Sequence, residues 1–107
     1  HVSTDDDWNV LKKFIGYTDV DKMKEKGDLH WNGQSPGSNE TGFTALAGGI
    51  RNDLGFEYIN YKANWWIYTL DSDSTCPYVQ IHADYSNIFI DSDDENLGLS
   101  VRCVKDN

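Results

Sequence analysis

The stretch Asn64-Trp65-Trp66-Ile67-Tyr68-Thr69-Leu70 carries the strongest structural signal in the chain. Trp, Ile, Tyr and Thr all favour the pleated strand, so the stretch predicts a β-strand. Neighbouring strand residues point to opposite faces, and each buried aromatic side chain removes roughly 150–250 Å² from water. We therefore expect a central strand, covered on both sides, with Trp65 and Trp66 in the core. The alternative is that one of the two tryptophans lines a ligand surface.

Length and charge argue against several classes of protein. The chain has 107 residues, which fits one domain, and its 18 acidic and 9 basic residues give a net charge of −9. Nucleic acids and anionic membranes attract basic surfaces, so neither is an expected partner. No apolar run approaches the roughly 20 residues of a membrane-spanning helix, and no stretch reads as a signal peptide. Because the chain starts abruptly at His1, we expect an upstream part to be missing.

The N-terminal part of the chain predicts two helices. The first spans residues 4–15, where Thr4 is a favourable N-cap and three aspartates occupy the positive end of the helix dipole. Residues three and four positions apart form its apolar stripe: Trp8, Leu11 and Ile15. The second, shorter helix spans residues 19–26 and ends at Gly27. Its charged residues, Lys24 among them, are expected in solvent.

The rest of the chain predicts short strands and long loops. A Gly- and Asn-rich loop at 28–42 precedes a short strand at 43–47, and an irregular stretch at 52–63 leads to the Trp65-Trp66 strand. After that strand a meander is expected, with strands at 78–83, 88–90 and 99–103, turns at 71–74 and 84–87, and an acidic loop at 91–96. The sequence thus predicts an α+β domain in which two N-terminal helices pack on a small twisted antiparallel sheet with long loops.

Four motifs, in order along nearly the whole chain, carry a family resemblance. They are His1-Val2-x-Thr4-Asp5-x-x-Trp8, Gly42-Phe43-x-Ala45-Leu46-x-Gly48-Gly49-x-Arg51, Trp65-Trp66 and Ser100-Val101-Arg102-Cys103-Val104. This pattern resembles the Fibrobacter succinogenes major paralogous domain family. The resemblance implies a C-type-lectin-like fold, related to the formylglycine-generating-enzyme branch, in a single domain over 1–107 that lacks its first upstream strand. It also implies a protein of Bacteroidetes or their relatives that is secreted or anchored at the bacterial cell surface as a lipoprotein.

The chain departs from that family pattern at several positions. Ser3 and Ala47 stand where the family has Pro, and residues 67–70 replace a Ser-Ser-Thr-Glu segment. Leu70 takes the place of the glutamate, so the chain lacks the carboxylate for a polar site shared at that position. Family members carry a Cys-Pro-x-Gly-Trp segment just before the His-Val pair, and this sequence does not include it. The cysteine of such an upstream segment would be a possible partner for Cys103. Cys103 could equally pair with Cys76, or either thiol could be free, and the sequence leaves these alternatives open.

Catalysis and metal binding have weak sequence support. His1, His30 and His82 lie in no recognised nucleophile, phosphate or metal motif, so we expect a protein that is not an enzyme and that has no cofactor. Carboxylates are dense at Asp71 and Asp73 and again in the loop that begins at Asp91. Calcium prefers six to eight oxygen ligands, but the EF-hand pattern fails here. Solvated loops are the better interpretation, and the alternative is a weak calcium site at Asp91, Asp93, Asp94 and Glu95.

Ligand recognition is the hypothesis that the sequence favours. Two loops, at 52–64 and 84–96, combine aromatic rings that can stack on sugar C–H groups with amides that can bind hydroxyl groups. The candidate ligand-binding residues are Tyr58, Asn60, Tyr61, Asn64, Tyr85 and Asn87. We therefore expect a non-catalytic extracellular module that binds carbohydrate, or a protein ligand in adhesion. The alternatives are a structural spacer in a larger cell-surface protein and a degenerate formylglycine-generating-type enzyme domain.

Overall fold

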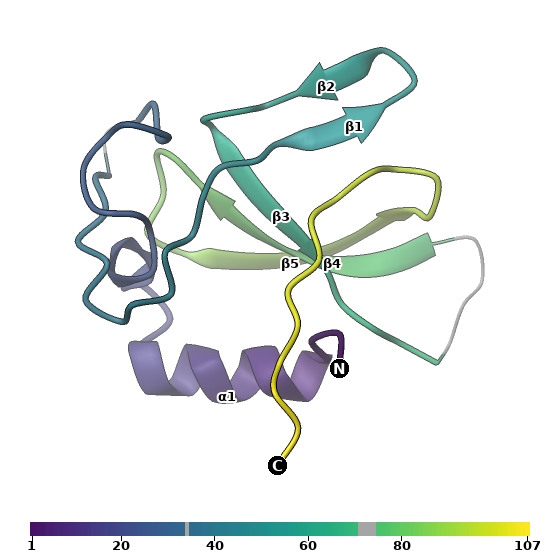
Figure 1. Ribbon diagram of the computed structural model, residues 1–107, viewed down its shortest axis with the longest axis horizontal. Helices are drawn as coiled ribbons and strands as arrows, with labels where there is room; N and C mark the ends of the chain where they lie inside the picture. The colour runs from purple at the N-terminus through teal and green to yellow at the C-terminus, as the bar shows by residue number, and fades with distance from the viewer. Residues whose placement is uncertain (34, 71–74) are drawn as a thin grey trace.

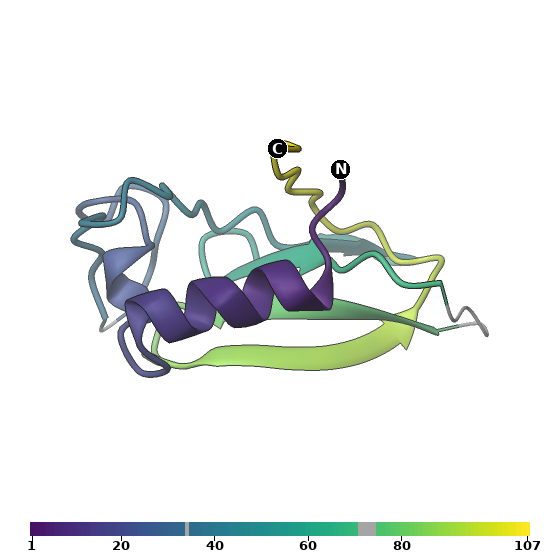
Figure 2. The same ribbon diagram turned by 90° about the horizontal axis from the view of Figure 1, so that it is seen from below.

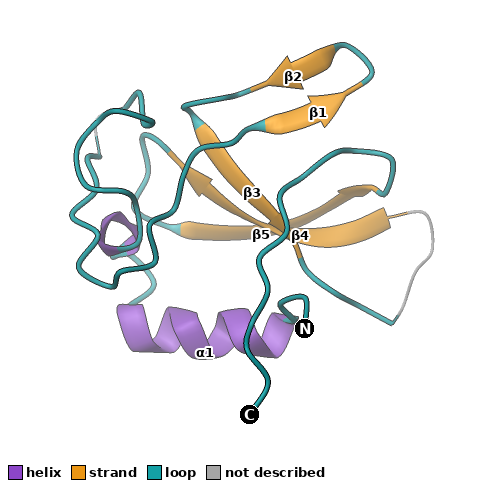
Figure 3. Ribbon diagram, viewed as in Figure 1, coloured by secondary structure: helices purple, strands orange, loops and turns teal. Residues whose placement is uncertain are grey.

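The structure is a computed structural model that describes residues 1–33, 35–70 and 75–107. It contains two small antiparallel sheets, with α1 lying across one face of the larger sheet (Figures 1 and 2). The larger sheet has the strand order β3-β4-β5, and β1 and β2 form a separate hairpin (Figure 3). The elements are α1 (Asp5–Ile15), the 3₁₀ turn η1 (Val20–Lys22), β1 (Ile50–Asn52), β2 (Gly55–Glu57), β3 (Lys62–Trp66), β4 (Thr75–His82) and β5 (Ile88–Asp94).

Helix α1 confirms the prediction for residues 4–15. Thr4 is the N-cap: its hydroxyl accepts from the backbone N–H of Asp7 at 3.3 Å, and the Asp7 carboxylate accepts from the Thr4 N–H at 2.9 Å. This reciprocal pair satisfies two N–H groups that the first helical turn leaves without partners. Trp8 and Ile15 of the expected stripe are buried, and Leu11 packs against the core.

The second predicted helix, and with it the predicted two-helix fold class, is wrong. Of the described residues, 14% are helical and 36% lie in strands or isolated β-bridges. The helix expected at 19–26 is reduced to η1, after which the backbone extends and pairs with the segment around Ala45. Ala45 donates to the carbonyl of Met23 at 2.8 Å and accepts from the N–H of Glu25 at 3.0 Å. A local helix period was therefore overridden by a long-range pairing that the sequence pattern does not reveal.

Lys24, expected in solvent, is fully buried. Its ammonium forms an ion pair with Asp21 at 2.9 Å and lies 5.2 Å from the ring centre of Trp31. It also donates to three backbone carbonyls in two separate segments: Ser35 at 3.1 Å in the loop before β1, and Ala83 and Tyr85 at 3.4 Å in the turn after β4. A buried charge is tolerated only when it is paired and hydrogen-bonded, and this site supplies both conditions. Lys24 thus ties the irregular loops to the end of β4.

The centre of the core is an aromatic cluster formed by Trp8, Phe43 and Trp65. Trp8 and Trp65 stack at 5.7 Å between ring centres, and Phe43 meets Trp65 edge to face at 5.7 Å and Trp8 at 6.0 Å. The three rings come from α1, from the loop before β1 and from β3. Arg102 closes the cluster from the C-terminal segment, with its guanidinium 4.0 Å from the ring centre of Phe43.

Strand β3 is shorter than predicted, and only one of its two tryptophans is fully buried. The expected strand at 64–70 ends at Trp66, and β3 lies at one end of the β3-β4-β5 sheet rather than at its centre. Its outer edge is met by the C-terminal segment, because the N–H of Trp66 donates to the carbonyl of Ser100 at 3.0 Å. Trp65 is 5% exposed, whereas Trp66 lies half-buried on the opposite face of the sheet.

Several smaller predictions also need correction. The segment 52–63, expected to be irregular, contains most of the β1–β2 hairpin, and the strand expected at 43–47 is a single bridge at Ala45. The acidic loop expected at 91–96 is largely strand, since β5 continues to Asp94. The strand expected at 99–103 is reduced to isolated bridges at Ser100 and Cys103, and Cys103 is exposed. The turn expected at 71–74 lies outside the described residues.

Replacing each tryptophan of β3 by alanine should separate core packing from surface packing. Trp65→Ala removes a ring from the aromatic cluster and should lower the free energy of unfolding by about 3–5 kcal/mol. Trp66→Ala should cost about 1–2 kcal/mol, because its ring is already partly in water. Urea denaturation followed by circular dichroism measures both. Equal losses for the two variants would contradict the burial described above.

Removing the charge of Lys24 should destabilise the domain despite the similar volume of the replacement. Lys24→Met leaves Asp21 and three carbonyl groups without their donor, so we expect a loss of about 2–4 kcal/mol in unfolding free energy. Lys26→Met is the matched control: Lys26 is exposed, and its replacement should change stability by less than about 0.5 kcal/mol. A Lys24→Met variant as stable as the parent would show that the contacts of the Lys24 ammonium with Asp21 and the three carbonyls contribute no net stability.

Candidate ligand-binding cleft

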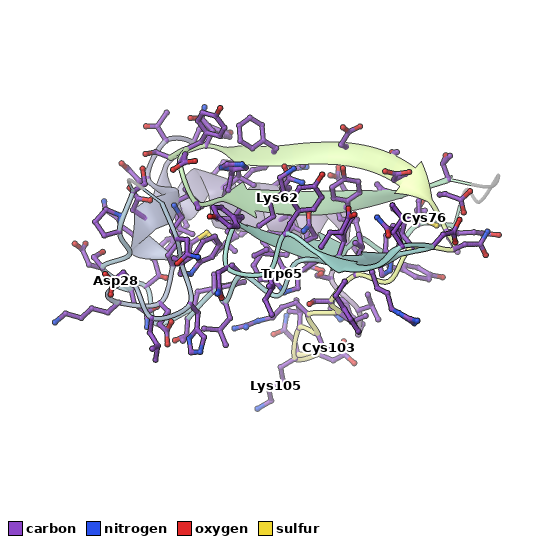
Figure 4. The ribbon with its side chains drawn as sticks, turned by 90° about the horizontal axis from the view of Figure 1, so that it is seen from above. Asp28, Lys62, Trp65, Cys76, Cys103 and Lys105 are labelled. Atoms are coloured by element: carbon purple, nitrogen blue, oxygen red, sulfur yellow. The ribbon has the colours of Figure 1, made fainter. Side chains whose placement is uncertain are left out.

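The face of the larger sheet that points away from α1, here called the outer face, carries aromatic and polar side chains. Strand alternation sends Ala63, Trp65, Val79 and Ile81 into the core, so their neighbours occupy the outer face. Register places these neighbours opposite one another in three cross-strand pairs: Lys62 with His82, Asn64 with Gln80, and Trp66 with Tyr78. Figure 4 looks onto this face and shows Lys62 near its middle.

A cleft of about 310 Å³ lies where the outer face meets the β1–β2 hairpin and residues 97–99. Strands β3 and β4 supply its floor with Lys62, Asn64, Tyr78 and Gln80. Its remaining lining residues are Ile50, Asn52, Glu57, Tyr58, Asp93, Leu97 and Leu99. The walls therefore combine aromatic rings, amides, carboxylates and one ammonium group in a single concave site.

Hydrogen bonds within the protein hold several polar side chains of this cleft in place. Asn64 is almost fully buried; its amide donates to the Gly49 carbonyl at 3.3 Å and accepts from the amide of Gln80 at 2.9 Å. On the hairpin wall, Asn52 donates to the Glu57 carboxylate at 3.0 Å. Side chains held in this way lose little conformational freedom on binding, which favours affinity.

Tyr58 sits at the mouth of the cleft in a strained backbone conformation. Its φ is +62°, in the left-handed region that bulky residues rarely adopt. The surrounding turn holds it there, because its carbonyl accepts from the N–H groups of both Tyr61 and Lys62 at 3.0 Å. The ammonium of Lys62 lies 4.2 Å from the centre of the Tyr58 ring, and Tyr58 is 46% exposed. Retained strain of this kind is common at ligand sites.

The charges around the cleft make it mildly acidic. Glu57 and Asp93 line it together with the single cation Lys62. Burial raises the pKa of the Tyr78 hydroxyl above 10, and the nearby carboxylates of Asp91 and Asp93 raise it further. Tyr78 is therefore a neutral hydroxyl at physiological pH, able to donate one hydrogen bond and to accept others.

A second group of aromatic rings adjoins the cleft on the same face. The rings of His82 and Tyr85 lie 4.7 Å apart, and Tyr85 meets Phe89 edge to face at 6.0 Å. Phe89 is the cross-strand partner of Gln80, and His82 is the partner of Lys62. The ring group thus begins directly beside the cleft floor. Burial and the charge of Lys62 lower the pKa of His82 below its ordinary value, an effect that Asp84 opposes.

The structure separates the sequence-predicted ligand residues into three sets. Tyr58 and Asn64 line the cleft, and Tyr85 belongs to the adjoining ring group. Asn60, Tyr61 and Asn87 lie in the flanking turns, outside the set of lining residues. Sequence reasoning missed Lys62, Tyr78 and Gln80, although the alternation along residues 78–83 could have assigned Tyr78 and Gln80 to a face opposite the core.

The suggested calcium ligands are spread along a strand instead of converging in a loop. Asp91 and Asp93 point to the outer face of β5, Asp94 points to the opposite face, and Glu95 follows in the turn. Within residues 1–33, 35–70 and 75–107, no three His, Cys, Asp or Glu side chains are grouped to hold a metal ion. Asp71 and Asp73 lie outside these ranges.

Cys76 and Cys103 are both free thiols, at the start of β4 and in the C-terminal segment respectively (Figure 4). The structure therefore selects the free-thiol alternative over a bond between these two residues. Among the described helices, none is both long enough and apolar enough to cross a membrane.

Fold and cleft together define a small, β-rich domain with a cleft lined by aromatic and polar side chains. The family model described as the Fibrobacter succinogenes major domain matches residues 1–105, so the chain belongs to this family. No curated protein and no solved structure gave a match. The family resemblance seen in the sequence is confirmed, and its implied link to C-type-lectin-like folds gains no support.

The ionisation of His82 offers a direct test of the outer-face geometry. In NMR titrations His82 should have a pKa below 6.5, and Lys62→Gln should raise it by removing a nearby positive charge. A lowered folded-state pKa means that the unfolded chain binds the proton more tightly. Protonation of His82 therefore favours the unfolded chain. The stability that neutral His82 contributes is fully present above about pH 6.5 and is lost as the pH falls through the lowered pKa. A pKa that Lys62→Gln leaves unchanged would contradict the proximity of the two residues.

Proposed function

We propose that this domain is a non-catalytic recognition module that binds carbohydrate in the cleft between the outer face and the β1–β2 hairpin. One observation carries the proposal: a single cleft combines Tyr rings with fixed amide and carboxylate groups. Aromatic faces accept the apolar C–H surface of a sugar ring, and amides and carboxylates bind its hydroxyl groups. The proposal includes the cell-surface setting that the family resemblance implies.

The electrostatics of the cleft favour neutral or amino sugars over acidic ones. Glu57 and Asp93 outnumber Lys62 in the lining, and the whole chain carries a net charge of −9. A uronate or sulfated sugar would therefore approach like charge at both short and long range. Carboxylates that accept from sugar hydroxyls or ammonium groups are the natural counterparts of this lining.

The test is a glycan array followed by titration of the sugars that bind, with two tyrosine variants. Tyr58→Asn removes the ring at the mouth of the cleft, and Asn is well suited to the positive φ at this position. We expect its affinity to fall at least about tenfold, because a stacking surface is lost. Tyr61→Asn is the matched control: Tyr61 is equally exposed, at 47%, and lies outside the cleft lining, so binding should persist.

Three results would count against the proposal. Absence of binding to every neutral and amino sugar on the array would contradict it outright. Equal losses for Tyr58→Asn and Tyr61→Asn would move the site away from the cleft. Release of new reducing ends from a bound oligosaccharide would contradict the non-catalytic part.

A further inference from the structure

We propose that the ligand is a glycan chain rather than a single sugar, and that the His82–Tyr85–Phe89 ring group is a second subsite beside the cleft. This inference rests on the proposed function and goes further, since it fixes the length class of the ligand. It also gives a role to three rings that the cleft itself does not use.

Continuity between the two sites is the first argument. His82 is the cross-strand neighbour of Lys62, and Phe89 is the neighbour of Gln80; both Lys62 and Gln80 line the cleft. Directly opposed residues of an antiparallel pair have Cβ atoms about 4.5–5.5 Å apart. The ring group therefore continues the cleft floor without a gap in the sheet.

Exposure is the second argument. Tyr85 is 55% exposed and Phe89 is 41% exposed, yet their rings contact each other and are held in place. The ring of His82 packs against that of Tyr85. The Nδ1 atom of His82 accepts from the N–H of Asp84 at 3.1 Å, and this hydrogen bond holds the imidazole in place. Rigid aromatic rings that are open to water can stack on the apolar C–H face of a sugar ring at little entropic cost.

Dimension is the third argument. On the outer face of β4, Tyr78 of the cleft floor and His82 of the ring group lie four residues apart, a span of about 13 Å along a strand. Phe89 lies beside Gln80 on β5 and widens this strip, and the ring of Tyr85 contacts those of both His82 and Phe89. A strip of this length exceeds one sugar ring, so a monosaccharide would leave the ring group unused. Neutral or amino-sugar chains fit the charge of the cleft described above.

The experiment compares neutral and amino-sugar oligosaccharides of one to six units, titrated against the parent domain, Tyr85→Ala and Tyr58→Asn. For the parent we expect affinity to rise at least about tenfold from the shortest ligand that binds to the longest. Tyr85→Ala should abolish that rise and leave the affinity for the shortest ligand unchanged. Tyr58→Asn should weaken the binding of every length, because it alters the cleft itself.

Controls separate a lost subsite from a damaged fold. Tyr68→Ala removes an equally exposed ring, at 54%, from outside the strip and should retain the dependence on chain length. Tyr85→Leu keeps apolar volume but lacks the flat ring, so it should behave like Tyr85→Ala while unfolding like the parent in thermal melts.

The outcomes distinguish this inference from the proposed function. Affinity independent of chain length, or a Tyr85→Ala variant that binds the longest ligand as the parent does, overturns the second subsite alone, provided that Tyr58→Asn still weakens binding. An equal loss for short and long ligands in Tyr85→Ala also overturns it. Failure of every oligosaccharide to bind the parent overturns both proposals.

Discussion

The aromatic cluster of Trp8, Phe43 and Trp65 is the contact on which the rest of the structure depends. It joins the one α-helix of the described chain to the larger sheet through a ring from an irregular loop. Ser3, itself buried, accepts from the indole N–H of Trp8 at 2.9 Å, so the polar atom of that ring is satisfied inside the core. Because Trp65 is drawn to this side of β3, alternation sends Asn64 and Trp66 to the outer face. The outer face, with its cleft, is therefore the reverse side of the strands that form the core.

A second organising contact replaces secondary structure where the chain has little of it. Between η1 and β1 the backbone makes scattered bridges rather than a ladder, and the buried ammonium of Lys24 joins this region, through the carbonyl of Ser35, to the carbonyls of Ala83 and Tyr85 after β4. One flexible side chain with three donors can meet irregularly placed acceptors that no regular ladder could reach. Trp31 covers the site, and its indole N–H donates to Ala45 at 2.9 Å. The loop region is therefore held by polar contacts as specific as those of a sheet.

Local rules predicted the elements that are decided locally. Thr4 and the aspartates predicted the start of α1, and the apolar stripe of that helix contains Trp8 and Ile15, which are buried. The prediction of a second helix at 19–26 was wrong. It assumed that the charged residues there face solvent, whereas Lys24 is buried and binds carbonyl groups distant in sequence. Residues 91–94 were predicted as loop because aspartate disfavours strands.

The structure shows what makes an acidic strand possible there. The carboxylates of Asp91 and Asp93 accept from the N–H groups of the next residues, Ser92 and Asp94, at 2.8 and 2.7 Å. Edge strands need such protection against unwanted pairing, and local side-chain acceptors provide it.

The composition of the sequence also predicted only part of the candidate site. Tyr58 and Asn64 were identified from loop composition, but Lys62 and Gln80 enter the cleft only through strand register, which one sequence does not give.

The pairing of the chain ends sets the order in which this domain can form. Val2 bridges to Cys103, Thr4 bridges to Tyr68, and the carbonyl of His1 accepts from Val104 at 2.7 Å. Contacts so distant in sequence carry a large loop-closure entropy and slow the search for the native state. During synthesis α1 would have no sheet to cover until β3 and β4 follow, and the edge of β3 stays open until residue 100 arrives. The domain therefore completes its fold only after nearly all of it has left the ribosome, which makes it a late-folding unit.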